Sequence, residues 1–306
     1  MARVLLFGKN GQVGWELQRS LAPLGDVVAL DFDNTDFCGD FTNLLSLAET
    51  VRTIKPDIIV NAGAYTAVDK AESEPDLVRT INALAPGALA MAAASIGAWL
   101  VHYSTDYVFD GSGSTPWVET DPPAPLNVYG SSKLEGEQLI QASGCKHLIF
   151  RTSWVYATRG GNFAKTMLKL AQERETLKVI NDQIGAPTSA ELLADVTAHA
   201  IAQVSAWRKD EALHRSGIYH VVAGGQTSWF DYANTVLALA RHAKIASKII
   251  AKSIEPVPSS AFQTKAKRPL NSRMNTQKLQ TTFGLTLPHW QQGVERMLAE
   301  FLDQPN

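Results

Sequence analysis

The sequence predicts an α/β protein in which helices cover both faces of a doubly wound parallel sheet. In the first half of the chain, short apolar runs alternate with longer segments whose apolar residues recur at helical spacing. The short runs are continuously apolar, which is typical of strands that are buried on both faces. With 306 residues, of which 45% are hydrophobic and 19% are charged, the chain can bury a sizeable core.

The elements of the first half follow one another in a regular order. Apolar runs predict strands, and a glycine or a proline separates most of them from the neighbouring helix. The segment 43–55 illustrates the helices, because Leu44, Leu47 and Val51 share one face and Pro56 ends the helix. We expect strands at residues 3–8, 27–31, 57–61, 99–104 and 147–153, and helices at residues 12–24, 43–55, 74–96 and 127–142.

The second half of the chain is less regular and predicts a smaller α/β domain. The clearest segments are helices at 163–175, 191–206, 229–242 and 291–302, and strands at 218–222 and 248–254. We therefore predict a first domain at residues 1–155 and a second domain at 156–306. The second domain is expected to be partly interleaved with the end of the sheet.

Charge and cysteine content exclude several classes of protein. The 28 basic residues are balanced by 30 acidic ones, so the net charge of −2 provides no general attraction to nucleic acid or to an anionic membrane. Cys38 and Cys145 are too few for a disulfide framework or a cysteine-based zinc site. The N-terminal apolar run is shorter than that of a signal peptide. These features predict a cytoplasmic protein.

One uncharged segment, residues 84–101, is about as long as a membrane-spanning helix. Its composition favours another interpretation, because alanine dominates it and Pro86, Gly87 and Gly97 interrupt it. A buried helix that ends near Gly97, followed by a strand from Trp99, accounts for this segment better. We therefore expect no membrane partner.

A glycine-rich turn, Gly8-Lys9-Asn10-Gly11-Gln12-Val13-Gly14, follows the first predicted strand and opens the first helix. Glycines in such a turn let the backbone approach a pyrophosphate at the helix N-terminus. Asp31 ends the second strand, where a carboxylate can accept hydrogen bonds from a ribose. The alternative is a tight strand-helix connection without a ligand. The position of the glycine turn, directly after the first strand, favours a Rossmann-type dinucleotide site. Asp31 favours NADH and Lys9 could meet the 2′-phosphate of NADPH, so both cofactors stay open.

Tyr129 and Lys133 are four residues apart and therefore lie on one face of a predicted helix. A lysine ammonium stabilises tyrosinate and lowers the pKa of a phenol, so that Tyr129 could exchange a proton with a sugar oxygen near neutral pH. In isolation this spacing more often marks an exposed amphipathic helix. The glycine turn upstream favours the catalytic interpretation.

A third group of polar residues, Ser104-Thr105-Asp106, ends a predicted strand. Open α/β sheets bind ligands at the carboxyl ends of their strands, and hydroxyl groups there can polarise a carbonyl. The alternative role is to cap the loop after the strand.

These motifs together resemble the extended short-chain dehydrogenases/reductases that act on nucleotide sugars. The similarity extends over essentially the whole chain. It is carried by GKNGQVGWE (8–16), CGDF (38–41), TAVDKAESE (66–74), STDYVF (104–109), NVYGSSK (127–133), RTSWVY (151–156) and NDQIGAPT (181–188). The resemblance implies a Rossmann-type first domain and a smaller substrate domain. It also implies the last step of dTDP-L-rhamnose synthesis, in which NADH or NADPH reduces the C4 carbonyl of dTDP-4-dehydro-6-deoxy-L-mannose.

The resemblance also assigns site residues. It places the cofactor on Gly8, Gly11, Gln12, Val13, Gly14, Asp31, Asp40, Phe41, Ala64, Tyr65, Thr66, Tyr129 and Lys133. Tyr129, Lys133 and Thr105 are the implied catalytic residues, with Tyr129 as proton donor. The dTDP-sugar is expected on Thr105, Asp106, Tyr129, Trp154 and Arg268. Trp154 could pack on a sugar or base, and its alternative role is that of a core aromatic. Arg268 could pair with the diphosphate.

The resemblance to some members of this family also implies a homodimer that is linked by magnesium, with glutamates as the metal ligands. Glu16 and Glu191 match two of these ligands, but the third position is Gln291, a neutral and weaker ligand for a hard cation. A metal-bridged dimer is therefore in doubt, and solvated helix charges explain both glutamates equally well.

Other members of the same scaffold are epimerases, dehydratases and non-catalytic regulatory subunits. The dehydratases that this chain resembles have the motif Thr-Asp-Glu at the end of the strand, whereas this chain has Thr105-Asp106-Tyr107. The missing glutamate favours simple reduction over elimination of water. A regulatory subunit could bind a dinucleotide without turnover, but the complete set of Thr105, Tyr129 and Lys133 favours an enzyme.

Overall fold

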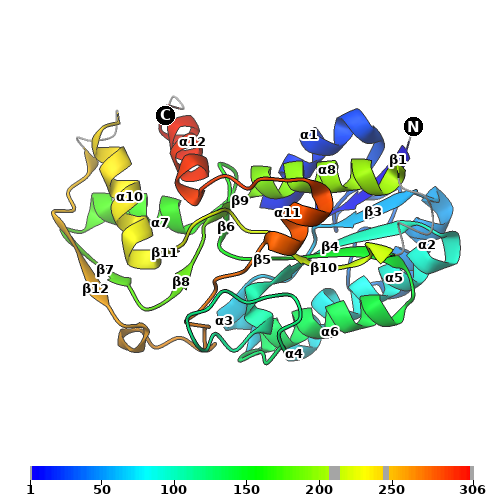
Figure 1. The fold of residues 1–306 in the computed structure, drawn as a ribbon, viewed down its shortest axis with the longest axis horizontal. Helices are drawn as coiled ribbons and strands as arrows, with labels where there is room; N and C mark the ends of the chain where they lie inside the picture. Colours follow the sequence, from blue (N-terminus) through cyan, green and yellow to red (C-terminus); the bar gives the residue numbers. More distant parts are fainter. Residues whose placement is uncertain (1, 207–213, 244–247, 304–306) are drawn as a thin grey trace.

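Across the residues that the computed structural model describes, 2–206, 214–243 and 248–303, six parallel strands form one central sheet (Figure 1). Their spatial order is β2-β1-β3-β4-β5-β10. The strands are β1 (Ala2–Phe7), β2 (Gly25–Leu30), β3 (Ile58–Asn61), β4 (Trp99–Thr105), β5 (Lys146–Thr152) and β10 (Gly217–His220). The chain leaves β1 in one direction for β2 and then returns to its other side for β3. The carboxyl ends of β1 and β3 therefore form the switch point at which such sheets bind ligands.

Helices cover both faces of the sheet, as the sequence predicts. One face carries α1 (Gln12–Leu21), α8 (Ala190–Ala206) and α11 (Gln277–Phe283), and the other carries α2 (Leu44–Ile54), α5 (Ala85–Ile96) and α6 (Val128–Ala142). Alternate residues of β1 supply the two cores: Leu6 packs toward the α1 and α8 face, and Leu5 toward the α2 and α5 face. This arrangement confirms the predicted α/β class.

The helical run Pro75–Ile96 is long and apolar enough to cross a membrane by length and composition, and 56% of its most apolar window is buried inside the protein. It consists of α4 (Pro75–Arg79), a π-helical turn (Thr80–Leu84) and α5, and the short α3 (Val68–Ala71) precedes it. Contacts of α5 with α2 and α6 account for its apolar character.

A second lobe lies beside the sheet, on the left of Figure 1. Its core is built from α7 (Phe163–Glu173), α10 (Trp229–Arg241), α12 (Trp290–Asp303) and the parallel pair β7 (Thr176–Ile180) and β12 (Ser253–Val257). Two short pairs join it to the sheet: β6 (Val155–Tyr156) with β9 (Thr188–Ser189), and β8 (Ile184–Gly185) with β11 (Thr227–Ser228). Within the described residues, 3-10 turns include η1 (Ala22–Leu24), η3 (Asp106–Val108) and η5 (Ser259–Ala261). A domain division at residue 155 remains a proposal, and β10 belongs to the sheet while α8 and α11 pack against it.

Two predicted elements differ from the structure. The helix expected at 12–24 ends at Leu21 and continues as η1, because Pro23 cannot donate to the helical hydrogen-bond ladder. The strand expected at 248–254 is wrong in its position, since the strand lies at Ser253–Val257. The backbone N–H groups of Ile250 and Ala251 instead donate to Ala171 O near the end of α7. Residues 244–247 lie outside the described chain.

Candidate active site

A cavity of about 970 Å³ opens where the carboxyl ends of β1, β3 and β4 meet. The glycine turn follows β1, the segment 62–66 follows β3, and Thr105 ends β4. Of the residues predicted from the sequence, Gly11, Gln12, Val13, Ala64, Thr66, Thr105, Asp106, Tyr129, Lys133 and Trp154 line this cavity. The sheet topology thus brings together most of a site whose parts are far apart in sequence.

The glycine turn is shaped by close backbone contacts. Gly8 has a φ of +81°, and a Cβ on it would lie 2.7 Å from Gly63 N. A Cβ on Gly14 would lie 1.9 Å from Gly8 O, so the start of α1 packs directly on the turn. Gly11 is less constrained, since its nearest atom, Gly8 O, would be 3.4 Å from a Cβ. Gly11 therefore leaves the helix N-terminus accessible to an anionic group.

Asp31 stands next to this turn but does not line the cavity. Its Oδ2 accepts a hydrogen bond from Asn10 N at 2.9 Å, and its Oδ1 accepts one from Phe32 N. Lys9 Nζ donates to Asn34 Oδ1 at 3.0 Å on the same edge. A carboxylate and an ammonium therefore flank the place where the sequence predicts the adenosine ribose.

Asp40 and Phe41 also lie outside the cavity lining. Asp40 Oδ1 accepts hydrogen bonds from both the N–H and the hydroxyl of Thr42. Phe41 is buried against Phe7, and its ring fills the space that a side chain at Gly63 would need. Phe41 thus packs against the loop after β3 at Gly63. The predicted contacts of Asp40 and Phe41 with an adenine stay predictions.

The loop after β3 is held by a residue that the sequence did not single out. Asn82, buried in the π-helical turn, accepts a hydrogen bond from Tyr65 N at 2.8 Å and donates to Tyr65 O at 3.0 Å. Its Nδ2 also lies 3.1 Å from Ser132 Oγ, beside Lys133. The Tyr65 hydroxyl donates to Glu74, so only its backbone is positioned by Asn82. Mid-helix π turns are frequent at functional sites, and this one couples the loop to α6.

Tyr129, which the sequence predicts as the proton donor, lies in the first turn of α6. Asn127 caps the helix through Gly130 N at 2.7 Å, and Gly130 packs on Tyr107 O with no room for a Cβ. Loss of water around the phenol, together with the charge of Asp106, raises the pKa of Tyr129 to about 12, and the Thr105 hydroxyl opposes this shift. The predicted lowering of this pKa by Lys133 is wrong, because desolvation raises the pKa and Lys133 is not among the groups that shift it. The phenol therefore carries its proton.

Thr105 and Asp106 are buried beside Tyr129. The Thr105 hydroxyl accepts from Tyr107 N at 3.1 Å and lies 3.0 Å from Asp106 Oδ1. Desolvation raises the pKa of Asp106 to about 6, although hydrogen bonds from Ser272 and Thr105 oppose the shift. The Oδ2 atom of Asp106 has no partner among the described residues. This atom is available to a ligand hydroxyl.

Trp154 is held in a strained and enclosed position. It is one of two described non-glycine residues with a positive φ, at +50°. Its indole stacks on that of Trp229, with ring centroids 3.6 Å apart and an interplanar angle of 16°. A Cβ on Gly185 would lie 2.8 Å from the same ring. One face of Trp154 is therefore already covered, and Trp229, which the sequence analysis did not identify, presents aromatic surface to the cavity as well.

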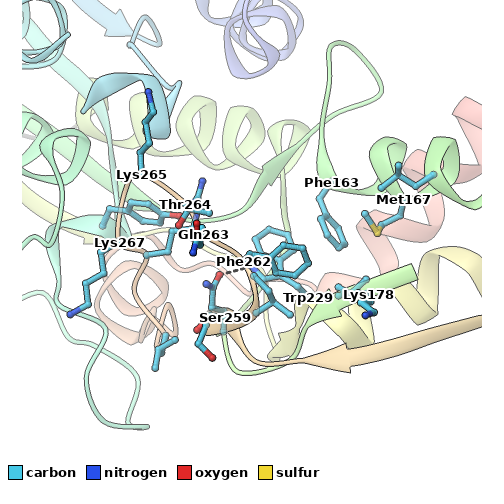
Figure 2. A pocket seen from close by; sticks show the side chains of 18 of the residues that line it. Phe163, Met167, Lys178, Trp229, Ser259, Phe262, Gln263, Thr264, Lys265 and Lys267 are labelled. Carbon is cyan, nitrogen blue, oxygen red and sulfur yellow. Dashed lines mark hydrogen bonds between the residues drawn. The ribbon is translucent and has the colours of Figure 1, made fainter. Parts of the chain in front are cut away.

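A second cavity, of about 820 Å³, adjoins the first, and Tyr107 and Trp229 line both. Figure 2 shows Phe163, Met167, Trp229 and Phe262 around it. Its charged lining residues are all basic: Arg174, Lys178, Lys265, Lys267 and Arg268. Arg268 Nη2 donates to Asp69 Oδ2 at 2.6 Å, so part of this guanidinium is already engaged. The predicted contact of Arg268 with a diphosphate remains a prediction.

Unpartnered polar atoms test whether this site fits a dinucleotide. Buried oxygens of Gln12, Ser104, Thr152 and Ser153 have no hydrogen-bond partner among the described residues, and all four residues line the first cavity. Buried polar groups of this kind are costly unless a ligand or water satisfies them. Together with the open backbone at Gly11, they fit a polar ligand of dinucleotide type that spans from the glycine turn toward Tyr129.

The glutamates predicted for Mg²⁺ each face an arginine, and the metal bridge between two copies stays a prediction. Glu16 lies 3.5 Å from Arg19 Nε, and Glu191 lies 3.5 Å from Arg296 Nε. Among the described residues, no group of three or more His, Cys, Asp and Glu side chains is arranged to hold one. Arginine cations accompany both carboxylates.

The fold and this site define a nicotinamide-dependent oxidoreductase of the extended short-chain dehydrogenase/reductase class. More particularly, the chain belongs to the RmlD substrate binding domain family, which it matches over residues 2–303.

Two relatives and two solved structures illustrate this membership. The chain is 61% identical to a dTDP-4-dehydrorhamnose reductase of Shigella flexneri over 97% of both chains, and 47% identical to that of Burkholderia thailandensis over 99% of this chain and 100% of that one. A dTDP-4-dehydrorhamnose reductase of Clostridium acetobutylicum has a TM-score of 0.85 at 35% identity, covering 97% of this chain and 99% of that one. The Bacillus anthracis enzyme, solved in complex with NADP, has a TM-score of 0.83 at 36% identity, covering 98% and 99%.

Proposed function

We propose that the chain reduces the C4 carbonyl of dTDP-4-dehydro-6-deoxy-L-mannose to a hydroxyl, which yields dTDP-L-rhamnose, with NADPH or NADH as the reductant. The observation that carries the proposal is the single cavity shared by the glycine turn, Thr105, Tyr129 and Lys133. The names of the relatives above and the NADP bound to the Bacillus anthracis neighbour support it. A cytoplasmic location is proposed with it, supported by the free cysteines Cys38 and Cys145. The homodimer implied by the resemblance also remains a proposal. Light scattering of the pure protein, which measures its molar mass in solution, tests it.

The side chains of the cavity provide the acid half of this reduction. A reduced nicotinamide, when bound, supplies the hydride that forms the new C–H bond at C4. The carbonyl oxygen gains its proton from the Tyr129 hydroxyl, which the raised pKa keeps protonated. Thr105, beside the phenol, is placed to hold the same oxygen. Tyr129 is left as phenolate and must regain a proton before the next turnover.

The second cavity suits the nucleotide part of the substrate. Five basic side chains line it, including Lys178 and Arg268, and this excess of positive charge favours a diphosphate. Phe163 and Phe262 offer aromatic surface for a base (Figure 2). Because Trp229 lines both cavities, a sugar nucleotide can extend from Tyr129 past this indole.

The reaction class is tested by two incubations. With dTDP-glucose the protein should form no product, because the sugar offers no carbonyl and Tyr107 replaces the carboxylate that an elimination would need. With the 4-keto sugar formed by 3,5-epimerisation, it should consume one reduced nicotinamide for each dTDP-L-rhamnose. Chromatography of both mixtures, with absorbance of the nicotinamide, decides the matter. A 4-keto product from dTDP-glucose would indicate a dehydratase, and product without nicotinamide oxidation would indicate an epimerase.

Cofactor choice is tested at Asp31. Asp31→Ala removes an acceptor for the ribose 2′-hydroxyl and relieves the repulsion of a 2′-phosphate, while Lys9 remains. The ratio of kcat/KM for NADPH to that for NADH should therefore rise. Asp33→Ala is the matched control, since it removes the same charge from the same loop at an exposed position. A ratio that moves equally in both variants would show that Asp31 does not face the ribose.

A further inference from the structure

Beneath Lys133, a chain of buried polar side chains crosses two strands, and the mechanism above does not use it. Asn61 is the last residue of β3, His102 lies in the middle of β4, and neither exposes more than 1% of its surface. Asn61 Nδ2 is 3.0 Å from His102 Nδ1, and His102 Nε2 is 3.1 Å from Lys133 Nζ. Lys133 Nζ also donates to Tyr103 O at 2.6 Å.

The hydrogen atoms of this chain can be assigned from one end. Gly63 N–H, which can only donate, bonds to Asn61 Oδ1 at 3.0 Å. The Asn61 amide nitrogen therefore faces His102, and it too can only donate. Nδ1 of His102 must accept this bond and carries no hydrogen. A neutral imidazole has one N–H, so its hydrogen is on Nε2, pointing at Lys133.

This tautomer favours one protonation state of Lys133. An amine nitrogen has a lone pair that accepts from His102 Nε2–H while its own N–H groups donate to Tyr103 O. An ammonium has no lone pair, so it would oppose the Nε2–H, or it would force a hydrogen onto Nδ1 against the Asn61 amide. The ammonium form therefore loses one hydrogen bond that the amine form makes.

We propose that Asn61 and His102 are positioning residues that make Lys133 a releasable proton donor rather than a permanent cation, by holding His102 in the Nε2–H tautomer. This inference rests on the proposed function, because it assigns the source of the proton that restores Tyr129. Tyr129 and Lys133 lie one turn apart on α6 and line the same cavity, so the proton crosses this cavity. In this step the Lys133 N–H bond breaks, the phenolate O–H bond re-forms, and a neutral amine remains beside His102 Nε2–H. No oxidant or reductant is needed.

The charges around Lys133 agree with this direction of transfer. Burial lowers the pKa of Lys133 to about 8, and Glu137, one turn further along α6, opposes the shift. The Glu137 carboxylate is itself paired with Arg151 of β5. Besides Lys133, the titratable or charged residues that line the cavity are Tyr103, Asp106, Tyr107, Tyr129 and Arg159. Burial and Lys133 together lower the pKa of His102 well below its ordinary value, so the imidazole stays neutral. A phenolate whose conjugate acid has a pKa of about 12 takes a proton readily from such an ammonium.

The tautomer can be observed without any substrate. Nitrogen-15 NMR of the histidine side chains in the full-length protein should show His102 with a protonated Nε2 and an unprotonated Nδ1 between pH 6 and 9, roughly the range in which histidine and Lys133 titrate. The His102→Asn variant assigns the signal among the 7 histidines of the chain. Protonation of Nδ1 in the natural protein would overturn the proposal. Because this measurement needs no turnover, it is independent of the proposed reaction.

The consequence for Lys133 is measured by the pH dependence of kcat. Asn61→Asp replaces the donor by an acceptor of the same shape, which favours the Nδ1–H tautomer and lets Nε2 accept from the ammonium. His102→Asn removes the Nε2–H altogether. Both changes raise the pKa of Lys133, so the alkaline limb of the kcat profile should move upward by about one to two pH units, the size of one hydrogen bond to a charged group.

A control separates this effect from a loss of packing. His147→Asn removes another buried histidine, which lies near the amino end of the neighbouring strand β5, outside the cavity, and whose Nδ1 bonds to Cys145 O. Its alkaline limb should stay in place. A lower kcat with an unmoved limb in both Asn61→Asp and His102→Asn would show a structural role only and would overturn the proposal. If Asn61→Asp does not fold, the NMR spectrum and His102→Asn still decide it.

Discussion

Replacing Tyr129 by phenylalanine should lower kcat by roughly 10²–10⁴-fold while leaving dinucleotide affinity near that of the natural protein. The change removes only the hydroxyl, which in the proposed reaction gives its proton to the carbonyl oxygen. The aromatic ring, which packs edge-on against Tyr107 at 5.7 Å between centroids, is kept. Oxidation of the reduced nicotinamide, followed by absorbance, measures turnover, and titration of the cofactor measures affinity.

The neighbouring phenol provides the control for this experiment. Tyr107 lines the same cavity and also contacts Arg268, so it is the other hydroxyl that could act as the acid. Desolvation raises the pKa of Tyr107 as well. Tyr107→Phe should therefore reduce kcat far less than Tyr129→Phe. The opposite order would transfer the acid role to Tyr107, and near-normal turnover of Tyr129→Phe would exclude Tyr129.

Glu137→Gln should lower the free energy of unfolding by about 3–5 kcal/mol. Glu137 on α6 accepts two hydrogen bonds from Arg151 on β5, at 2.9 and 2.6 Å, and both side chains are almost fully buried. Glutamine preserves the shape but removes the charge, which leaves the guanidinium buried over the Phe109 ring without its counter-ion. Urea denaturation, with midpoint and slope both fitted, measures the loss.

An exposed ion pair on the same helix supplies the matched control. Glu135 is paired with Arg79 at 2.7 Å, but the Arg79 side chain is 55% exposed. Glu135→Gln should cost less than about 1 kcal/mol, because water already screens this pair. A loss for Glu137→Gln as small as that of Glu135→Gln would contradict the importance of the buried pair.

The sheet half of the molecule could be predicted because its signals are local. Each strand from β1 to β5 contains three or four consecutive apolar residues, and a glycine or proline stands near its ends. The turn from Gly8 to Gly14 can be recognised by its glycines, and at two of these positions, Gly8 and Gly14, the structure has no room for a Cβ. Because parallel strands place their carboxyl ends at one edge, the motifs after β1, β3 and β4 had to meet there.

What the sequence could not reveal depends on partners that are distant along the chain. β7 has only alternate buried residues, and it pairs with β12, which contains Pro256, so neither strand forms a strong apolar run. Trp229 becomes a wall of the site only because Trp154, far upstream, adopts a positive φ and stacks on it. His102 follows three apolar residues of β4, but its role depends on the distances to Asn61 and Lys133, which only the structure gives.

The place of β10 at the end of the sheet has a consequence for synthesis of the chain. β10 is residues 217–220 and pairs in parallel with β5, which ends at Thr152. A ribosome therefore synthesises β1 to β5 of the central sheet well before β10, the sixth strand of this sheet. During this interval β5 presents a bare, apolar edge whose backbone groups can recruit strands from other nascent chains. A fragment that stops at residue 155 would keep this edge permanently. Expression of residues 1–155 alone is therefore expected to give aggregates. In the full chain, β10 covers the edge of β5 once it has been synthesised.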